Sequence, residues 1–244
     1  MSTKRPGVDS STRLSKIMDV KLWEKVESQF APFLASVKEM EDCNTEYEGL
    51  RNQFSSDSSK DCISKEELMV VVRWKFSVGK KRAALMKHLN SNTDKSVQQC
   101  SKKAIAHARR MEKSFDDWRG DDFKTCINHL TELSGVGPAT ASAVLSMIRP
   151  DVFPYMYDEC IDTFLPKRTY TLPVYLQVAK SCTELSKDLK GWSPARIART
   201  LWIAARVCAS KGDFEDFTLQ KDKTRKQVET ANTSKRSTKR RRRS

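Results

Sequence analysis

The chain has 244 residues, of which 38% are hydrophobic, and its five Trp and ten Phe residues can furnish a sizeable core. No unbroken apolar run is long enough to cross a bilayer, and the polar amino terminus lacks the apolar centre of a signal peptide, so we expect a soluble, intracellular protein with no membrane partner. The net charge of +14 is concentrated at one end, because residues 221–244 hold eleven Lys or Arg against two carboxylates.

Helical periodicity begins near residue 20, and Pro32 is expected to break or kink that helix. Ser64 and Glu67 form a capping-box signature, which predicts a second helix that ends near Gly79. Further helices are predicted over 81–89, 95–111 and 123–133.

The last predicted helix covers 195–209, because Ser193 and Pro194 make an N-cap and first-turn pair, and Pro173 is expected to begin the helix before it. No alternating strand pattern and no internal repeat is found. The sequence therefore predicts an all-α fold, with one helical domain between two disordered ends. The predicted boundaries are 1–18 for the disordered amino terminus, 19–212 for the helical domain and 213–244 for the disordered basic tail.

The seven cysteines show no CxxC pairing, and we expect reduced thiols that are mostly buried. Their spacing does not fit the four-cysteine pattern of an iron–sulfur cluster. The three histidines, His88, His107 and His129, lie about twenty residues apart and have no ligand-like neighbours. We therefore expect no metal ion bound by side chains.

The stretch LSGVGPATA, from Leu133 to Ala141, predicts a tight turn between two helices. Gly135 and Gly137 can adopt dihedrals that other residues avoid, and Pro138 suits the first turn of the following helix. The backbone N–H groups at this helix N-terminus can be approached closely and suit a phosphate oxygen. The alternative is a purely structural turn. The residues expected to bind phosphate are Gly135, Val136, Gly137, Ala139 and Thr140.

This stretch resembles the hairpin of the helix-hairpin-helix motif, and the segment VFPYMYDEC that follows it resembles the catalytic segment of the helix-hairpin-helix DNA glycosylase superfamily. The resemblance implies an all-helical fold, DNA as partner, and a monovalent cation at the hairpin backbone as the one cofactor. It also implies that Asp158, 19 positions after Ala139, is catalytic. A helix over 140–148 rises roughly 14 Å, and the nine residues that follow it can span about 30 Å, so Asp158 can fold back beside the hairpin.

The chain departs from the family at three points. One is that Tyr155, Met156 and Tyr157 stand between Pro154 and Asp158, whereas the family usually has its aspartate soon after the proline. Ala139 stands where bifunctional members carry the lysine that forms a Schiff base, and the iron–sulfur cluster of some members is absent. The resemblance therefore implies a monofunctional glycosylase of base excision repair, in which Asp158 stabilises charge on the sugar or orients water after the base is flipped. An alternative role for Asp158 is to cap a helix that begins at Glu159.

The basic tail predicts a nuclear protein, because its charge clusters are typical of import signals that bind an import receptor, although such a tail can equally contact nucleic acid. The signal residues are Lys235, Arg236, Lys239, Arg240, Arg241, Arg242 and Arg243. Two non-enzymatic functions remain open. One is a DNA-binding or chromatin-binding adaptor that uses the hairpin as a phosphate anchor, and the other is a helical protein-interaction domain.

The stretch RWKFSVGKKRAAL interleaves cations with aromatic side chains. Such a pattern is found on surfaces that stack bases and bind phosphates. We favour the alternative, a helix whose Trp74 and Phe76 lie in or near the core while the cations stay in solvent. The cations are Arg73, Lys75, Lys80, Lys81 and Arg82.

Overall fold

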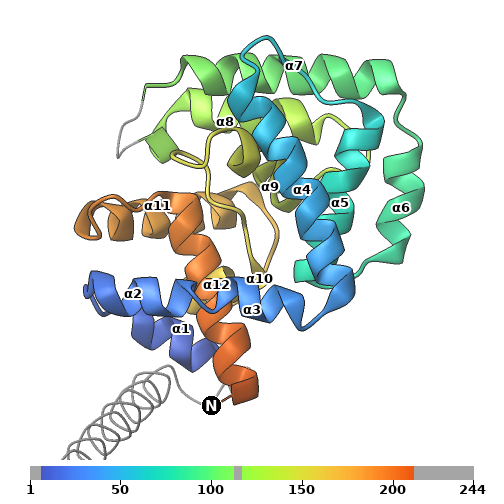
Figure 1. Ribbon diagram of the computed structural model, residues 1–244. Coiled ribbons are helices and arrows are strands. Elements are labelled where there is room, and N and C mark those ends of the chain that lie inside the picture. Colours follow the sequence, from blue (N-terminus) through green and yellow to red (C-terminus); the bar gives the residue numbers. More distant parts are fainter. Residues whose placement is uncertain (1–6, 113–116, 212–244) are drawn as a thin grey trace, which may run out of the picture.

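The helical segments of the sequence form α-helices in the computed structural model, which describes residues 7–112 and 117–211 (Figure 1). Within these residues there are twelve α-helices, one short 3-10 turn and no strand, so the all-α prediction is confirmed. The helices are α1 Val8–Leu14, α2 Val20–Glu27, α3 Phe30–Ala35, α4 Lys38–Ser56, α5 Lys65–Val78, α6 Ala83–Asn90, α7 Asp94–Arg110, α8 Asp121–Thr131, α9 Pro138–Ile148, α10 Asp158–Phe164, α11 Leu172–Asp188 and α12 Pro194–Lys211. The 3-10 turn spans Asp117–Arg119.

The helices pack in two groups that meet across α9 and the segment 149–157. One group holds α4–α9, drawn at the top and right of Figure 1, and the other holds α1–α3 with α10–α12. Buried side chains of both groups belong to one continuous core. Nine of the eleven residues of α9 are buried, because small Ala, Ser and Thr side chains let neighbouring helices approach it closely.

The prediction that residues 1–18 are disordered is wrong for the part that the structure describes. Helix α1 buries Val8 and Leu14 completely or nearly so, and it packs on α10 and α12. The hydroxyl of Ser11 lies 2.7 Å from that of Thr163 on α10. A short helix with one apolar side chain in each turn is stabilised mainly by tertiary contacts of this kind. The polar composition of residues 1–18 gives no sign of these contacts. The predicted tail 213–244, with its import-signal residues, lies outside the described residues.

Several predicted helix ends are confirmed. Ser64 and Glu67 form both hydrogen bonds of the capping box at the start of α5. The Ser193 hydroxyl accepts the N–H of Arg196 at 3.2 Å, and Pro194 is the first residue of α12. The break expected at Pro32 occurs a few residues earlier, because α2 ends at Glu27 and Pro32 lies in the first turn of α3, where a missing N–H is tolerated.

Candidate functional site

The hairpin joins α8 to α9, and its first glycine is required by the fold. Gly135 has φ +75°, and a Cβ there would lie 3.0 Å from His88 Cβ and 3.0 Å from the backbone nitrogen of Leu89. The preceding residue is held in place by Asn92, whose amide accepts the N–H of Ser134 at 2.9 Å and donates to its carbonyl at 2.8 Å. The hairpin is therefore a rigid turn packed closely on α6.

The second glycine faces open space. Gly137 has an extended backbone with φ −100°, and a Cβ built on it meets no atom within 4 Å. The N–H groups of Gly135, Gly137 and Ala139 donate to no backbone carbonyl among the described residues. These three donors lie at the N-terminus of α9, where the helix dipole favours negative charge. This is the arrangement that the sequence predicted for a phosphate site.

Two of the residues predicted to bind phosphate have backbone amides that are already used. Val136 donates its N–H to the Leu133 carbonyl at 3.1 Å, and its side chain is buried, so its assignment as a phosphate ligand is corrected. Thr140 donates its N–H to the Gly137 carbonyl at 2.9 Å. The valine between the two glycines therefore anchors the turn in the core, and Thr140 can contribute only its hydroxyl.

Asp158 is the first residue of α10, and its side chain is not a helix cap. The N-cap position belongs to Tyr157, whose side chain makes no capping hydrogen bond. Arg168 Nη1 donates to Asp158 Oδ2 at 2.5 Å, and Tyr170 Oη donates to Asp158 Oδ1 at 2.8 Å. Arg168 also binds Asp162, through Nε at 2.9 Å to Oδ1 and through Nη2 to Oδ2. The alternative prediction of a cap on a helix starting at Glu159 is therefore wrong.

Asp158 and the hairpin line the same pocket, which we call the hairpin pocket. The sequence placed them 19 positions apart, and the structure brings them together, since α9 runs away from the hairpin and the segment 149–157 returns beside it. Cations from α5 and from the stretch after it complete the pocket. Its polar and glycine lining is Lys75, Lys80, Arg82, Gly135, Gly137, Thr140, Tyr155, Asp158 and Tyr170.

Lys75 is the site residue that sequence reasoning did not single out. Its side chain is partly buried beside the hairpin, where its Nζ donates to Thr140 Oγ1 at 3.0 Å. Burial and, to a smaller extent, the nearby Arg82 guanidinium lower the pKa of its amine to about 8, while Asp158 partly opposes both. Within the described residues Lys75 forms no ion pair. A desolvated cation without a carboxylate partner is costly and is typical of functional sites.

The other cations of the pocket are arranged around its mouth. Arg82 stacks its guanidinium on the Tyr170 ring at 4.4 Å, and Tyr170 in turn binds Asp158. Lys80 is exposed and has no ion-pair partner among the described residues, whereas its neighbour Lys81 pairs with Glu39 and does not line the pocket. Three cations therefore face one carboxylate, which makes the pocket favourable for an anion.

The stretch RWKFSVGKKRAAL, which contains Lys75, places some of its side chains in the core and others in the hairpin pocket. Trp74 is 4% exposed and stacks on Tyr47, so the prediction of a core aromatic residue is confirmed for it. The cations do not all stay in solvent as that interpretation required, because Lys75 lies beneath the hairpin. A contact between residues 75 and 140 has no local signal in the sequence.

No group of three or more His, Cys, Asp or Glu side chains that could hold a metal ion occurs in the part of the chain that the structure describes. Cys43, Cys62, Cys100, Cys126, Cys160 and Cys182 are free thiols, and the last three of these are buried. Two hairpin carbonyls, those of Leu133 and Ser134, already accept hydrogen bonds, and a monovalent cation there would need their second lone pairs. The cation remains a prediction.

None of the described helices has the length and apolar content that a membrane span requires. Comparison of the chain with protein families, with curated proteins and with solved structures found no match. The assignment of a function therefore depends on the geometry of the hairpin pocket and on the motif itself.

Proposed function

We propose that this protein binds DNA by placing one backbone phosphate in the hairpin pocket. The observation that carries the proposal is that the free N–H groups of the hairpin and three cations converge on one cavity. A phosphate oxygen would accept hydrogen bonds from Gly137 and Ala139, while Lys75 and Lys80 neutralise its charge. Because the hairpin is held rigidly by Asn92, these donors need no rearrangement before binding.

A second candidate function, removal of a damaged or mispaired base, is favoured by the position of Asp158. The carboxylate faces the same pocket as the phosphate donors and is oriented by Arg168 and Tyr170. A fixed negative charge beside a flipped nucleotide would stabilise the positive charge that develops on the sugar as the base departs. With Ala139 at the position of the family's lysine, the activity proposed is monofunctional, without strand cleavage through a Schiff base at that position.

The phosphate proposal is tested by adding a carboxylate to the pocket without straining the backbone. Gly137→Glu in the full chain places its side chain in open space, and its charge opposes a phosphate. We expect at least about tenfold weaker binding to a DNA duplex, since a like charge at about 4 Å costs about 1–4 kcal/mol. Gly49→Glu is the matched control, because Gly49 is exposed on α4 and also has open space around it. If the two variants bind the duplex with equal affinity, the hairpin is only a structural turn, and the protein-interaction alternative is favoured.

Salt dependence gives a second test that leaves the glycines intact. Lys80→Gln should reduce the slope of log affinity against log salt by about 0.9, the value for one phosphate contact. Lys81→Gln removes an adjacent cation that lies outside the pocket and should leave the slope nearly unchanged. The basic tail is present in both variants and contributes equally to each.

Base removal is tested on duplexes that carry a panel of damaged bases, with the release of abasic product as the readout. Asp158→Asn should abolish product while retaining DNA binding. Asp162→Asn is the control, because Asp162 binds the same arginine but does not line the pocket. Binding without product on every lesion would identify the protein as the non-catalytic adaptor. In either function, import into the nucleus through Lys235, Arg236 and the basic cluster at 239–243 remains a prediction.

A further inference from the structure

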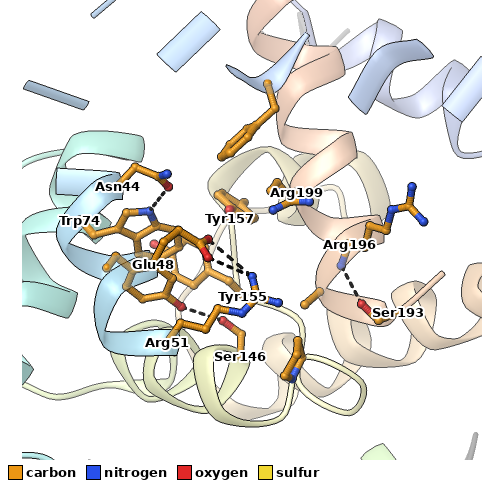
Figure 2. A pocket seen from close by; sticks show the side chains of 14 residues that line it. Asn44, Glu48, Arg51, Trp74, Ser146, Tyr155, Tyr157, Ser193, Arg196 and Arg199 are labelled. Carbon is orange, nitrogen blue, oxygen red and sulfur yellow. Dashed lines mark hydrogen bonds and ion pairs between the residues drawn. The ribbon is translucent and has the colours of Figure 1, made fainter. Parts of the chain in front are cut away.

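Tyr155 also lines a second cavity, and this cavity shares no other residue with the hairpin pocket. Figure 2 shows it between α4 on one side and α12 on the other, with the segment 149–157 below. It lies where the two groups of helices meet, is open to solvent, and has a cavity volume of about 160 Å³. We call it the arginine cavity.

The inner wall of the arginine cavity is aromatic. The Trp74 and Tyr47 rings stack with their centroids 4.0 Å apart, and Trp74 also contacts Tyr155 at 4.9 Å. Tyr157 meets Tyr155 edge to face at 4.4 Å. Phe30 of α3 completes this wall. Because each ring is held by another ring, the wall is rigid and suits a planar ring that packs against it.

Two tyrosine hydroxyls on this wall have no protein partner. Within the described residues, neither Tyr155 nor Tyr157 makes a hydrogen bond through its hydroxyl, although Tyr47 donates to the Ala143 carbonyl at 2.8 Å. Burial raises the pKa of both phenols well above the usual value, so each remains a neutral donor. Neither hydroxyl is among the described side-chain atoms that are fully buried without a partner, so each is open to the cavity and can donate to a ligand there.

Three arginines line the cavity, and Figure 2 shows Arg51 and Arg199 next to the aromatic rings, whereas the guanidinium of Arg196 points away from them. Arg196 and Arg199 of α12 share one carboxylate, that of Glu27, at distances of 2.5 to 3.0 Å. Arg51 of α4 pairs only with Glu48, one turn away, at 3.2 Å. Arg196 and Arg199 are also held over the rings of Trp192 and Phe30. The guanidinium groups are therefore oriented before any ligand binds.

These arginines keep unused donors. Three terminal nitrogens donate to no acceptor among the described residues: Arg51 Nη2, Arg196 Nη1 and Arg199 Nη1. Arg199 Nε is also buried without a partner. Charge decides which ligand fits. An aromatic wall alone would also suit a quaternary ammonium group, but three guanidinium groups against the Glu48 and Glu27 carboxylates leave an excess of positive charge. The cavity therefore favours an anion, and arginine is the side chain best matched to phosphate.

We propose that the arginine cavity binds a nucleoside 5′-monophosphate group, with its base against the aromatic wall and its phosphate on the free N–H groups of Arg51 and Arg199. The tyrosine hydroxyls donate to acceptors on the base. The nucleotide comes either from the free pool or from the 5′-phosphorylated end of a strand, since both present the same chemistry. This inference does not rest on phosphate binding at the hairpin, because the two cavities have separate donors.

The experiment titrates the full chain with dAMP and TMP by calorimetry. Both nucleotides are expected to bind at least tenfold more tightly than deoxyadenosine, which lacks the phosphate, and than inorganic phosphate, which lacks the ring. Arg51→Gln should weaken nucleotide binding at least tenfold, and it leaves only a partly exposed ion pair unmade. Arg73→Gln is the matched control, because Arg73 forms an exposed ion pair with Glu46 outside the cavity.

Arg199→Gln provides a second variant that retains the ion pair between Arg196 and Glu27, and thermal melting shows whether each variant is folded. Oligonucleotides with and without a 5′-phosphate distinguish the two sources. A preference for the phosphorylated end that Arg51→Gln abolishes identifies a strand end, and binding of mononucleotides alone identifies the free nucleotide. Absence of nucleotide binding, or nucleotide binding that both arginine variants retain in full, would overturn the proposal. Gly137→Glu leaves this cavity intact, so the two proposals can fail separately.

Discussion

Replacing Lys75 with methionine should make the protein more stable and impair its binding to DNA. Methionine is apolar, unbranched and of similar length, so it can occupy the space beneath the hairpin without a charge. The side chain that it replaces is partly buried, and its amine is held by one hydroxyl, that of Thr140. A group that destabilises the fold at neutral pH is retained more readily for function than for structure.

The magnitude follows from the pKa of Lys75, which burial lowers from 10.5 to about 8. One pKa unit corresponds to about 1.36 kcal/mol, so the protonated amine is disfavoured in the folded state by about 3 kcal/mol. Loss of the hydrogen bond to Thr140 costs about 1 kcal/mol. Lys75→Met should therefore raise the free energy of unfolding by about 2 kcal/mol at pH 7.

The gain in stability should depend on pH in a defined direction. Below pH 8 both the folded and the unfolded chain carry the proton, and the full penalty is present. Between pH 8 and 10.5 the unfolded chain keeps a proton that the folded chain has lost, so the stability of the wild type rises with pH. The advantage of Lys75→Met should therefore shrink as the pH approaches 10.5.

Urea unfolding at pH 7 and near pH 10, followed by tryptophan fluorescence, measures both effects, and an unchanged m-value shows that the two states are comparable. Lys80→Met is the control, because an exposed lysine of the same pocket should change stability by less than about 0.5 kcal/mol. The reasoning is refuted if Lys75→Met is less stable than the wild type at pH 7, or if the difference between them does not change with pH.

Three further predictions concern binding and the fold. DNA affinity of the wild type should fall as the pH rises through about 8, where Lys75 loses its proton, whereas Lys75→Arg should show no fall there; duplex titrations across this range check it. Gly135→Ala should lower stability by about 2–4 kcal/mol, because of its positive φ and the contact with His88, while Gly137→Ala should be neutral or stabilising by up to about 1 kcal/mol in thermal or urea unfolding. Burial works to raise the pKa of Glu27, but hydrogen bonds from its two arginine partners outweigh burial and lower it. The stability advantage of the wild type over Glu27→Gln should therefore be full above pH 4.5 and diminish as the pH falls below it, in unfolding curves recorded from pH 7 downward.

Local patterns predicted the parts of the fold that are locally determined. Capping signals placed the starts of α5 and α12, and the two glycines placed the hairpin, because these features depend on residues within one turn of each other. Helix α1 was missed because its stability comes from packing on α10 and α12, more than 140 residues away. The phosphate assignment of Val136 failed for a similar reason, since the core holds that residue.

The candidate site could be predicted only along one segment of chain. The spacing of Asp158 from the hairpin was readable, whereas its partners Arg168 and Tyr170 depend on how the chain turns after α10. Lys75 was visible only as one of several cations in a mixed stretch. Its burial and its lowered pKa arise from the close approach of α5 and α9, which no pattern within either helix encodes.

The position of Asp158 beside the hairpin follows from hydrogen bonds of the segment 149–157. The Ser142 hydroxyl of α9 accepts the N–H of Met156 at 3.1 Å, and the Tyr175 hydroxyl of α11 donates to the Pro154 carbonyl at 3.0 Å. Chain length alone permits many paths for this segment, but a buried polar group must be paired, and these bonds select one path. The N-terminus of the same α9 carries the N–H groups that we propose to bind phosphate, so one helix holds both the carboxylate and these donors. Tyr155 lies on this segment and faces both cavities, so a nucleotide bound in one cavity would bear directly on the wall of the other.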